Sequence, residues 1–245
     1  MVAEPKDNNM KKMILLAGLG IASVCSASAQ WVTVGPEIGI NSTSFMERYN
    51  GVDVSDGMRA GLKVGGIVDI AFTRHFSLQP GLFYNMKGAQ EKYVSTTTTD
   101  NGTIRTEEIR NDFRINYIEM PLNLEFKLGR PGHGHFIFGA GPYVAVALNG
   151  TIINANGSSI ILPSGRVITT ENDHSSTAYI GNSVDDDITP LDGGLNLNMG
   201  YESPMGLFVR GNMGFGLANI LPQGDSYNYI RNWGMGVSVG YLFGR

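Results

Sequence analysis

The chain has 245 residues, a formal net charge of −4 and a hydrophobic share of 42%. Its 18 basic residues are outnumbered by 22 acidic ones, so composition offers no cationic surface for nucleic acid. A single cysteine, Cys25, excludes a disulfide framework within the chain.

The N-terminal stretch has the features of a secretory signal peptide. A basic segment at 10–12 precedes an apolar run at 13–24, and Ala27-Ser28-Ala29 supplies the small-x-small pattern of a cleavage site. We expect residues 1–29 to be a cleaved signal peptide with an upstream extension, and residues 30–245 to form the mature domain. Cleavage removes three lysines, two acidic residues and the cysteine, so the mature net charge becomes −5.

After residue 29 there is no apolar run of about 18 residues, so a membrane span would have to be built from strands. Eight runs alternate between large apolar residues and small, polar or charged ones, which is the period of a strand with two different faces. These runs lie at 32–40, 61–70, 76–87, 117–127, 136–148, 194–202, 207–217 and 233–243.

The last run shows how the two faces differ. Trp233, Val237 and Phe243 belong to its bulky face, while glycine and serine fill most of the opposite one. Small and polar residues suit the crowded interior of a narrow barrel, and the bulky face then suits lipid. A water-soluble sandwich with its apolar faces packed against each other also fits the alternation. The lengths of the connections distinguish this sandwich from a membrane barrel.

Short and long connections alternate along the chain. The short ones are 73–75, 129–134 and 203–205, and the long ones are 42–58, 88–113, 149–190 and 218–230. Outer-membrane barrels have this asymmetry between periplasmic turns and outer loops. The sequence therefore predicts an all-β fold, an eight-stranded antiparallel up-and-down transmembrane β-barrel with short periplasmic turns and long extracellular loops. An even strand count places both termini on the periplasmic side.

Two of the long connections contain hairpin signals. Asp100-Asn101-Gly102 and Pro163-Ser164-Gly165 are tight-turn sequences between short strand-like segments. Strands three to six are therefore expected either to project beyond the membrane and expose sheet to partners, or to end in solvated loops.

Four prolines fall inside the predicted strands: Pro36, Pro80, Pro121 and Pro142. A closed barrel has no edge strand that could hold a residue without a backbone N–H. We therefore expect bulges or locally missing ladder pairs at these positions.

Charged residues of the eight runs lie on the face that is predicted to point inward. The predicted lumen network consists of Glu37, Lys63, Asp69, Lys87, Glu119, Glu125 and Arg210. Unpaired charges in a closed interior would cost several kcal/mol, so the three glutamates should pair with Lys63, Lys87 and Arg210. Eight strands leave room for side chains but not for a wide channel, which favours a filled polar lumen over a conducting path.

Other candidate sites are weaker. His133 and His135 could hold a metal but lack a third ligand, and Asp185-Asp186-Asp187 lacks the alternating ligand spacing of a calcium loop. No histidine falls inside a predicted strand near the membrane rim, where a lipid-modifying enzyme would need one. The sequence therefore predicts no enzyme activity, no metal and no cofactor.

The run Tyr117-Ile118-Glu119-Met120-Pro121-Leu122 resembles a motif of the PorT-like outer-membrane β-barrel family of Bacteroidetes-type bacteria, and the likeness extends over about residues 31–245. Tyr117, Ile118, Glu119, Pro121 and Leu122 carry the motif. The resemblance implies an eight-stranded barrel in the outer membrane of a Gram-negative bacterium, of the kind often labelled porin-like. The sequence departs from the family pattern at its end, where Gly244 and Arg245 follow the terminal aromatic Phe243.

These observations predict a small integral outer-membrane barrel that acts through its extracellular loops, in surface interaction, adhesion or envelope integrity. The alternatives are a narrow porin-like channel for ions or small solutes and, more remotely, a secretion-accessory barrel. A soluble lipocalin-like binder would need an apolar interior, which the glycine, asparagine and charged residues do not provide. Expected partners are outer-membrane lipid, the barrel-assembly machinery during insertion and an extracellular partner of the loops, with no role for nucleic acid.

Overall fold

The computed structural model describes residues 31–130 and 133–244, and the expected signal peptide at 1–29 lies outside the described residues. The described chain forms β1 (Trp31–Tyr49), β2 (Val52–Ser55), β3 (Gly57–Ala71), β4 (Phe76–Thr98), β5 (Ile104–Gly129), β6 (His135–Ile161), β7 (Val167–Thr177), β8 (Leu191–Glu202), β9 (Leu207–Gly216) and β10 (Tyr229–Tyr241). No helix in this part of the chain has the length and apolar character needed to cross a bilayer.

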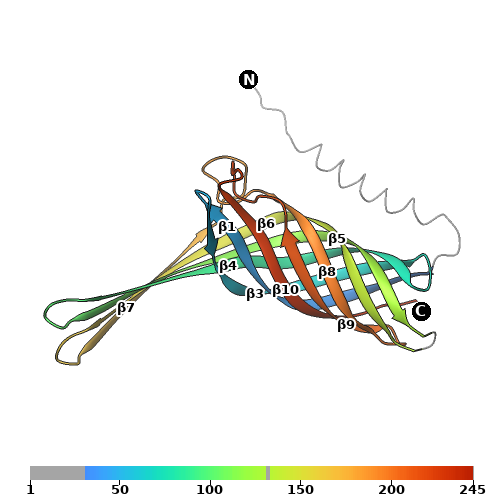
Figure 1. The fold of residues 1–245 in the computed structure, drawn as a ribbon, viewed down its shortest axis with the longest axis horizontal. Coiled ribbons are helices and arrows are strands. Elements are labelled where there is room, and N and C mark those ends of the chain that lie inside the picture. Colours follow the sequence, from blue (N-terminus) through green and yellow to red (C-terminus); the bar gives the residue numbers. More distant parts are fainter. Residues whose placement is uncertain (1–30, 131–132, 245) are drawn as a thin grey trace, which may run out of the picture. The chain divides into compact units, whose positions relative to one another are not determined.

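Eight of these strands close into a ring (Figure 1). The hydrogen-bonded order is β1, β3, β4, β5, β6, β8, β9, β10, and β10 then pairs back to β1, for example at Glu37 with Gly240. The two additional strands lie outside the ring, since β2 extends from β1 and β7 from β6. The predicted eight-stranded antiparallel up-and-down barrel is confirmed.

The two ends of the barrel differ in the way that the connections predict. Short connections, 72–75, 130–134 and 203–206, join neighbouring strands at one end, which we call the short-turn end; the opposite end is the long-loop end. The start of β1 and the end of β10 meet at the short-turn end, where Val34 pairs with Phe243.

The bulky faces of the strands point away from the lumen. Ile40 is 71% exposed, Val144 54% and Val237 57%, whereas Glu37 and Arg210 on the other face are buried. A water-soluble protein would hide such a continuous apolar band in a core, so the soluble sandwich is excluded. This exposed band is the surface that the sequence predicts to face lipid.

Each of the four prolines lies at a gap in the ladder. Between β4 and β5 the pair that would include Pro121 is missing, although the pairs on either side keep one register. Equivalent gaps occur at Pro36 between β1 and β10, at Pro80 between β3 and β4, and at Pro142 between β5 and β6. The prediction of missing pairs is confirmed, and the unchanged register shows that these gaps are not bulges.

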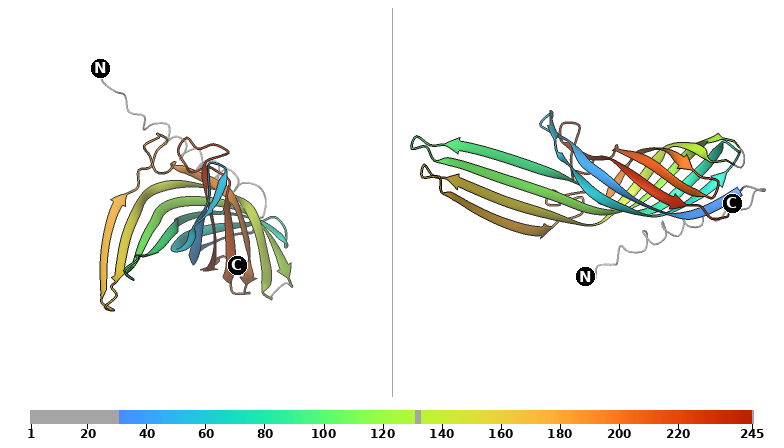
Figure 2. Two further views of the ribbon diagram at one scale, coloured as in Figure 1. Left: turned by 60° about the vertical axis from the view of Figure 1, so that its left-hand side comes forward. Right: turned by 90° about the horizontal axis from the view of Figure 1, so that it is seen from below.

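Three strands continue far beyond the barrel. β4, β5 and β6 have 23, 26 and 27 residues, whereas β8, β9 and β10 have 12, 10 and 13. Together with β7 they form a four-stranded sheet that extends from the long-loop end (Figures 1 and 2). We call residues 91–98, 104–111, 154–161 and 167–177 the projecting sheet. Both predicted hairpins are confirmed, because Thr98 pairs with Ile104 and Ile161 with Val167.

One prediction about this region was wrong. The sixth predicted strand does not project, since β8 begins at Leu191 and pairs with β6 only within the barrel. The fourth strand of the projecting sheet is instead β7, in the middle of the connection predicted at 149–190. From Thr169 onward β7 is polar on both faces, so no apolar stripe reveals its full length.

Candidate functional site

Arg210 occupies the centre of a buried polar cluster in the lumen. Its guanidinium pairs with both carboxylate oxygens of Glu37, donates a hydrogen bond of 2.5 Å to Gln79 and lies 3.6 Å from Glu125. Ser238 also donates to Glu37, at 2.7 Å. These five side chains come from β9, β1, β4, β5 and β10, so one cation connects strands from around the ring.

A glycine makes room for this cluster. A Cβ atom added to Gly139 on β6 would overlap the carboxylate of Glu125 and the amide of Asn198. The Asn198 amide donates to Glu125 at 2.8 Å. The small residues on the inner face therefore provide the space that the buried polar side chains fill, as the sequence suggests.

A second cluster lies towards the short-turn end. Lys127 pairs with Asp69, which also accepts a hydrogen bond of 2.6 Å from Ser77. The ammonium of Lys127 is 3.9 Å from Glu202, and His135 is 3.0 Å from the same carboxylate. This end of the lumen thus also carries paired charges.

A third cluster lies towards the long-loop end. The Lys87 ammonium lies between two carboxylates, 2.7 Å from Glu119 and 3.1 Å from Asp192, and 4.3 Å from the centre of the Tyr143 ring. Asn232 donates to Asp192 at 3.0 Å. A single buried cation therefore compensates two buried anions.

The structure places the seven predicted network residues on the inner face of the barrel. Six of them take part in the three clusters, and Glu37, Glu119 and Glu125 each lie within ion-pair distance of a cation. Lys63 differs from the expectation. No described carboxylate lies within ion-pair distance of its ammonium, which sits 4.1 Å from the centre of the Phe83 ring.

Sequence reasoning omitted three members of these clusters from its network. Lys127 and Glu202 lie in predicted strands on the inward face, but the predicted network does not include them. Asp192 lies outside the predicted strands, because the sixth of them begins at residue 194. Extending the alternation back to Leu191 would have placed Asp192 on the same face as Asn196 and Asn198.

Apolar clusters separate and cap these charges. At the long-loop end Ile188 and Ile220, from the connections after β7 and β9, are buried with Phe45 and Tyr117. A second cluster consists of Ile67, Phe83, Phe208 and Leu242. The sequence predicts a polar lumen, but the structure differs: several inward positions carry bulky apolar side chains.

Little space remains in the interior. A cavity of about 60 Å³ is lined by Lys63, Lys87 and Glu119 among others, and one of about 10 Å³ by Asn123 and Asn198 among others. Such volumes hold a few water molecules at most. The filled lumen is a structural core made of ion pairs, hydrogen bonds and two apolar clusters.

A comparison with protein families agrees with this geometry. Residues 28–221 match the family described as outer membrane protein beta-barrel domain. The chain belongs to this family. No curated protein matches the sequence.

Solved structures similar to this outer membrane protein come from bacteria. Ail, the attachment invasion locus protein of Yersinia pestis, solved in complex with the heparin analogue sucrose octasulfate, is 9% identical with a TM-score of 0.35, covering 86% of this chain and 99% of its own. Neisserial surface protein A is 12% identical with a TM-score of 0.36, covering 89% and 100%. The toluene transporter TodX of Pseudomonas putida is 12% identical with a TM-score of 0.21, covering 87% and 90%.

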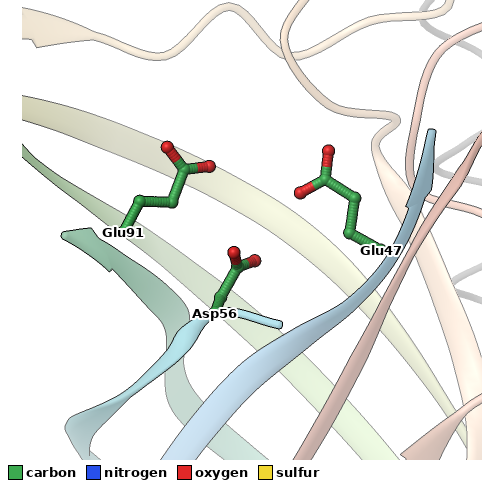
Figure 3. A group of neighbouring side chains, drawn as sticks. All are labelled: Glu47, Asp56 and Glu91. Atoms are coloured by element: carbon green, nitrogen blue, oxygen red, sulfur yellow. The ribbon is translucent and has the colours of Figure 1, made fainter. Parts of the chain in front are cut away.

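The outer membrane protein also carries an acidic cluster at the long-loop end, beyond the lipid-facing band. Glu47, Asp56 and Glu91 each direct a carboxylate oxygen into one small region, where these atoms lie within 4.8 Å of one another (Figure 3). Among the described residues no lysine or arginine lies within ion-pair distance of them, although Asn111 donates to Glu91 at 2.9 Å. The sequence does not reveal this cluster because its members come from two separate connections, 42–58 and 88–113, whose contact depends on the fold.

Burial and mutual repulsion disfavour the charged form in this cluster. Partial burial, with the charges of Glu47 and Glu91 nearby, raises the pKa of Asp56 to about 6. Burial and the charge of Glu91 also raise the pKa of Glu47. In the same hairpin, hydrogen bonding to Arg48 lowers the pKa of Asp53, so two neighbouring aspartates should titrate in different pH ranges.

We expect the long-loop end to become less stable as pH rises. Asp56 is protonated more readily in the folded than in the unfolded chain, so it favours folding at low pH, and this advantage disappears as pH rises through about 6. Asp56→Asn should reduce this pH dependence and leave only the part that comes from Glu47. An NMR titration of carboxyl carbons should give a midpoint near 6 for Asp56 and a much lower one for the control, Asp53. Equal midpoints would contradict the expectation.

Proposed function

We propose that this outer membrane protein acts at the cell surface through its projecting sheet, in surface interaction, adhesion or envelope integrity. The observation that carries the proposal is the length of β4, β5 and β6, which continue well beyond the lipid-facing band together with β7. Both faces of this sheet are largely exposed, so it contributes little to the core of the barrel. Its backbone and side chains are available to a partner outside the membrane.

The lumen supports a structural role for the barrel in place of transport. Buried ion pairs centred on Lys87, Lys127 and Arg210 cross-link the wall, and apolar clusters fill the interior between and above them. An ion moving through would have to break these pairs and pass dry apolar side chains. Steady conductance in planar bilayers would therefore contradict this part of the proposal.

The narrower family assignment rests on the sequence motif. We propose that the protein belongs to the PorT-like group of Bacteroidetes-type bacteria, because residues 117–122 resemble the motif of that group, and its members Tyr117 and Glu119 are buried in the lumen. We also place both termini in the periplasm, together with the short-turn end. The exposed apolar band then contacts outer-membrane lipid, and the barrel-assembly machinery inserts the chain.

Trypsin treatment of intact cells tests where the projecting sheet lies. Arg166 is exposed in the turn between β6 and β7, so cleavage after it should divide the chain while the outer membrane is intact. Arg166→Gln should prevent this cut. The folded barrel should also migrate differently on gels before and after boiling, which serves as the control for folding. If Arg166 is cut only after the outer membrane is permeabilised, the sheet faces the periplasm and the proposal is wrong.

A further inference from the structure

We propose that copies of this chain associate side by side in the membrane, with the β4 edge of one projecting sheet pairing with the β7 edge of the next. The proposal rests on the projecting sheet being outside the membrane. It names a second copy of the chain as the partner, and it follows from the free edges, the strand directions and the charges of the sheet.

Both edges of the projecting sheet are open. β7 pairs with β6 on one side, and no described strand lies on its other side. The last pair of β4 with β3 is Gln90 with Gly57, so residues 91–98 are paired only with β5. Rows of unpaired N–H and C=O groups on such edges readily pair with another extended chain. The unpaired backbone groups of these edges therefore favour another β-strand as the partner.

The strand directions select which edges can meet. β4 runs away from the barrel and β7 runs back towards it, because β5 and β6 alternate between them (Figure 1). Two copies inserted with the same orientation in one membrane would thus bring β4 and β7 together antiparallel. Two β4 edges, or two β7 edges, would meet parallel, which is the slightly weaker arrangement.

The register within one sheet shows which residues would face each other. The pairs Lys92↔Arg110, Arg110↔Ala155 and Ala155↔Asp173 place Lys92 and Asp173 on one row across the four strands. A copy displaced along that row brings its Lys92 beside Asp173 of the first copy. The same register places Thr96 opposite Thr169, and both pairs point to one face of the sheet.

Charge favours this pairing over the symmetric ones. Asp173 and Glu171 make β7 acidic, so two β7 edges would repel one another. On β4 the same register sets Lys92 opposite Asp173, and Glu91, on the other face, opposite His174 and not opposite a carboxylate. Lys92 is half-exposed, and its ion pair with Glu108, at 3.1 Å, is itself partly exposed to solvent. Opposite charges that face each other across two strands stabilise the pairing, while like charges destabilise it.

Because the two edges differ, the association is head-to-tail. Each copy then keeps one free β4 edge and one free β7 edge, so further copies can add until a ring closes or an array forms. Such an assembly would give a surface protein many identical binding faces in a row.

Cysteine cross-linking tests the contact directly, because the only native cysteine, Cys25, lies in the segment expected to be cleaved. Thr96→Cys and Thr169→Cys are made as separate variants and co-expressed in the outer membrane under oxidising conditions. Each variant alone should remain monomeric, and the mixture should give a disulfide-linked dimer. A chain carrying both cysteines should give a ladder, since the two sites of one chain are three strands, or about 14 Å, apart, which is too far for a disulfide.

Charge reversal provides the matched control. Lys92→Glu or Asp173→Lys should each lower the cross-linking yield about tenfold, and the two together in one chain should restore it. Gel mobility before and after boiling confirms that each variant is folded. The proposal is overturned if the mixture yields no dimer, or if either cysteine variant alone cross-links as well as the mixture. Trypsin cleavage at Arg166 on intact cells would still place the sheet at the surface, so the two proposals can fail separately.

Discussion

Replacing Arg210 by methionine is expected to destabilise the barrel by about 3–5 kcal/mol, the cost of leaving a buried charge without its partner. The guanidinium compensates Glu37 directly, lies 3.6 Å from Glu125 and donates to Gln79, and both carboxylates are almost completely buried. Methionine has a similar length but no charge, so two carboxylates would face an apolar side chain. Urea-induced unfolding in lipid vesicles, followed by gel mobility without boiling, measures the loss.

A second substitution shows whether charge causes the loss. Adding Glu37→Gln to Arg210→Met should recover part of the stability, because one of the two uncompensated charges is then removed. Arg210→Lys should be more stable than Arg210→Met but less stable than the wild type, although it keeps the positive charge. Lysine cannot pair with both oxygens of Glu37 while it also donates to Gln79. If the double variant is no more stable than Arg210→Met, the loss comes from packing and the electrostatic account is wrong.

The barrel could be predicted from sequence because lipid and lumen impose opposite preferences on alternate residues. Ile38 and Val239 point outward, while their neighbours Glu37 and Ser238 point into the lumen. Apolar and polar residues therefore alternate along the strand. The alternation of short and long connections then supplied the topology. Neither signal depends on which residues pair, so both can be recognised in a single sequence.

That logic fails where both faces of a strand have the same surroundings. In the projecting sheet both faces meet water, and the exposed strand β7 carries no alternation at all. Phe83 and Phe208 point into the lumen, but the residues before and after each of them in the sequence are also apolar. The alternation that distinguishes the two faces is therefore lost at these positions. The apolar clusters and the full length of the sheet therefore appear only in three dimensions.

Contacts between distant segments escape prediction for a different reason. Lys87 and Asp192 are 105 positions apart in sequence, and their contact depends on the register of several strands and on the curvature of the ring. Sequence placed Lys87, Glu119 and Lys63 on one face but could not show that Lys63 would settle over Phe83. Faces follow from local alternation, whereas partners depend on geometry across the lumen.

Lys87→Met is expected to produce a loss of similar size, about 3–5 kcal/mol. Among the described residues, this ammonium alone lies within ion-pair distance of both Glu119 and Asp192, so its removal leaves two buried anions close together. Asp192→Asn should cost only about 1–2 kcal/mol, because Lys87 keeps Glu119 and the amide can still accept hydrogen bonds from Tyr143 and Asn232. The same unfolding measurement in lipid vesicles gives both values.

Lys92→Met is the matched control for Lys87→Met, since it removes the same group from an exposed ion pair in the projecting sheet. It should change stability by no more than about 1 kcal/mol. Comparing the two variants shows whether the buried cation Lys87 stabilises the fold more than the exposed cation Lys92 does. If Lys87→Met costs no more than Lys92→Met, the buried charges do not stabilise the barrel. The glycine-rich lumen would then depend on its apolar clusters alone.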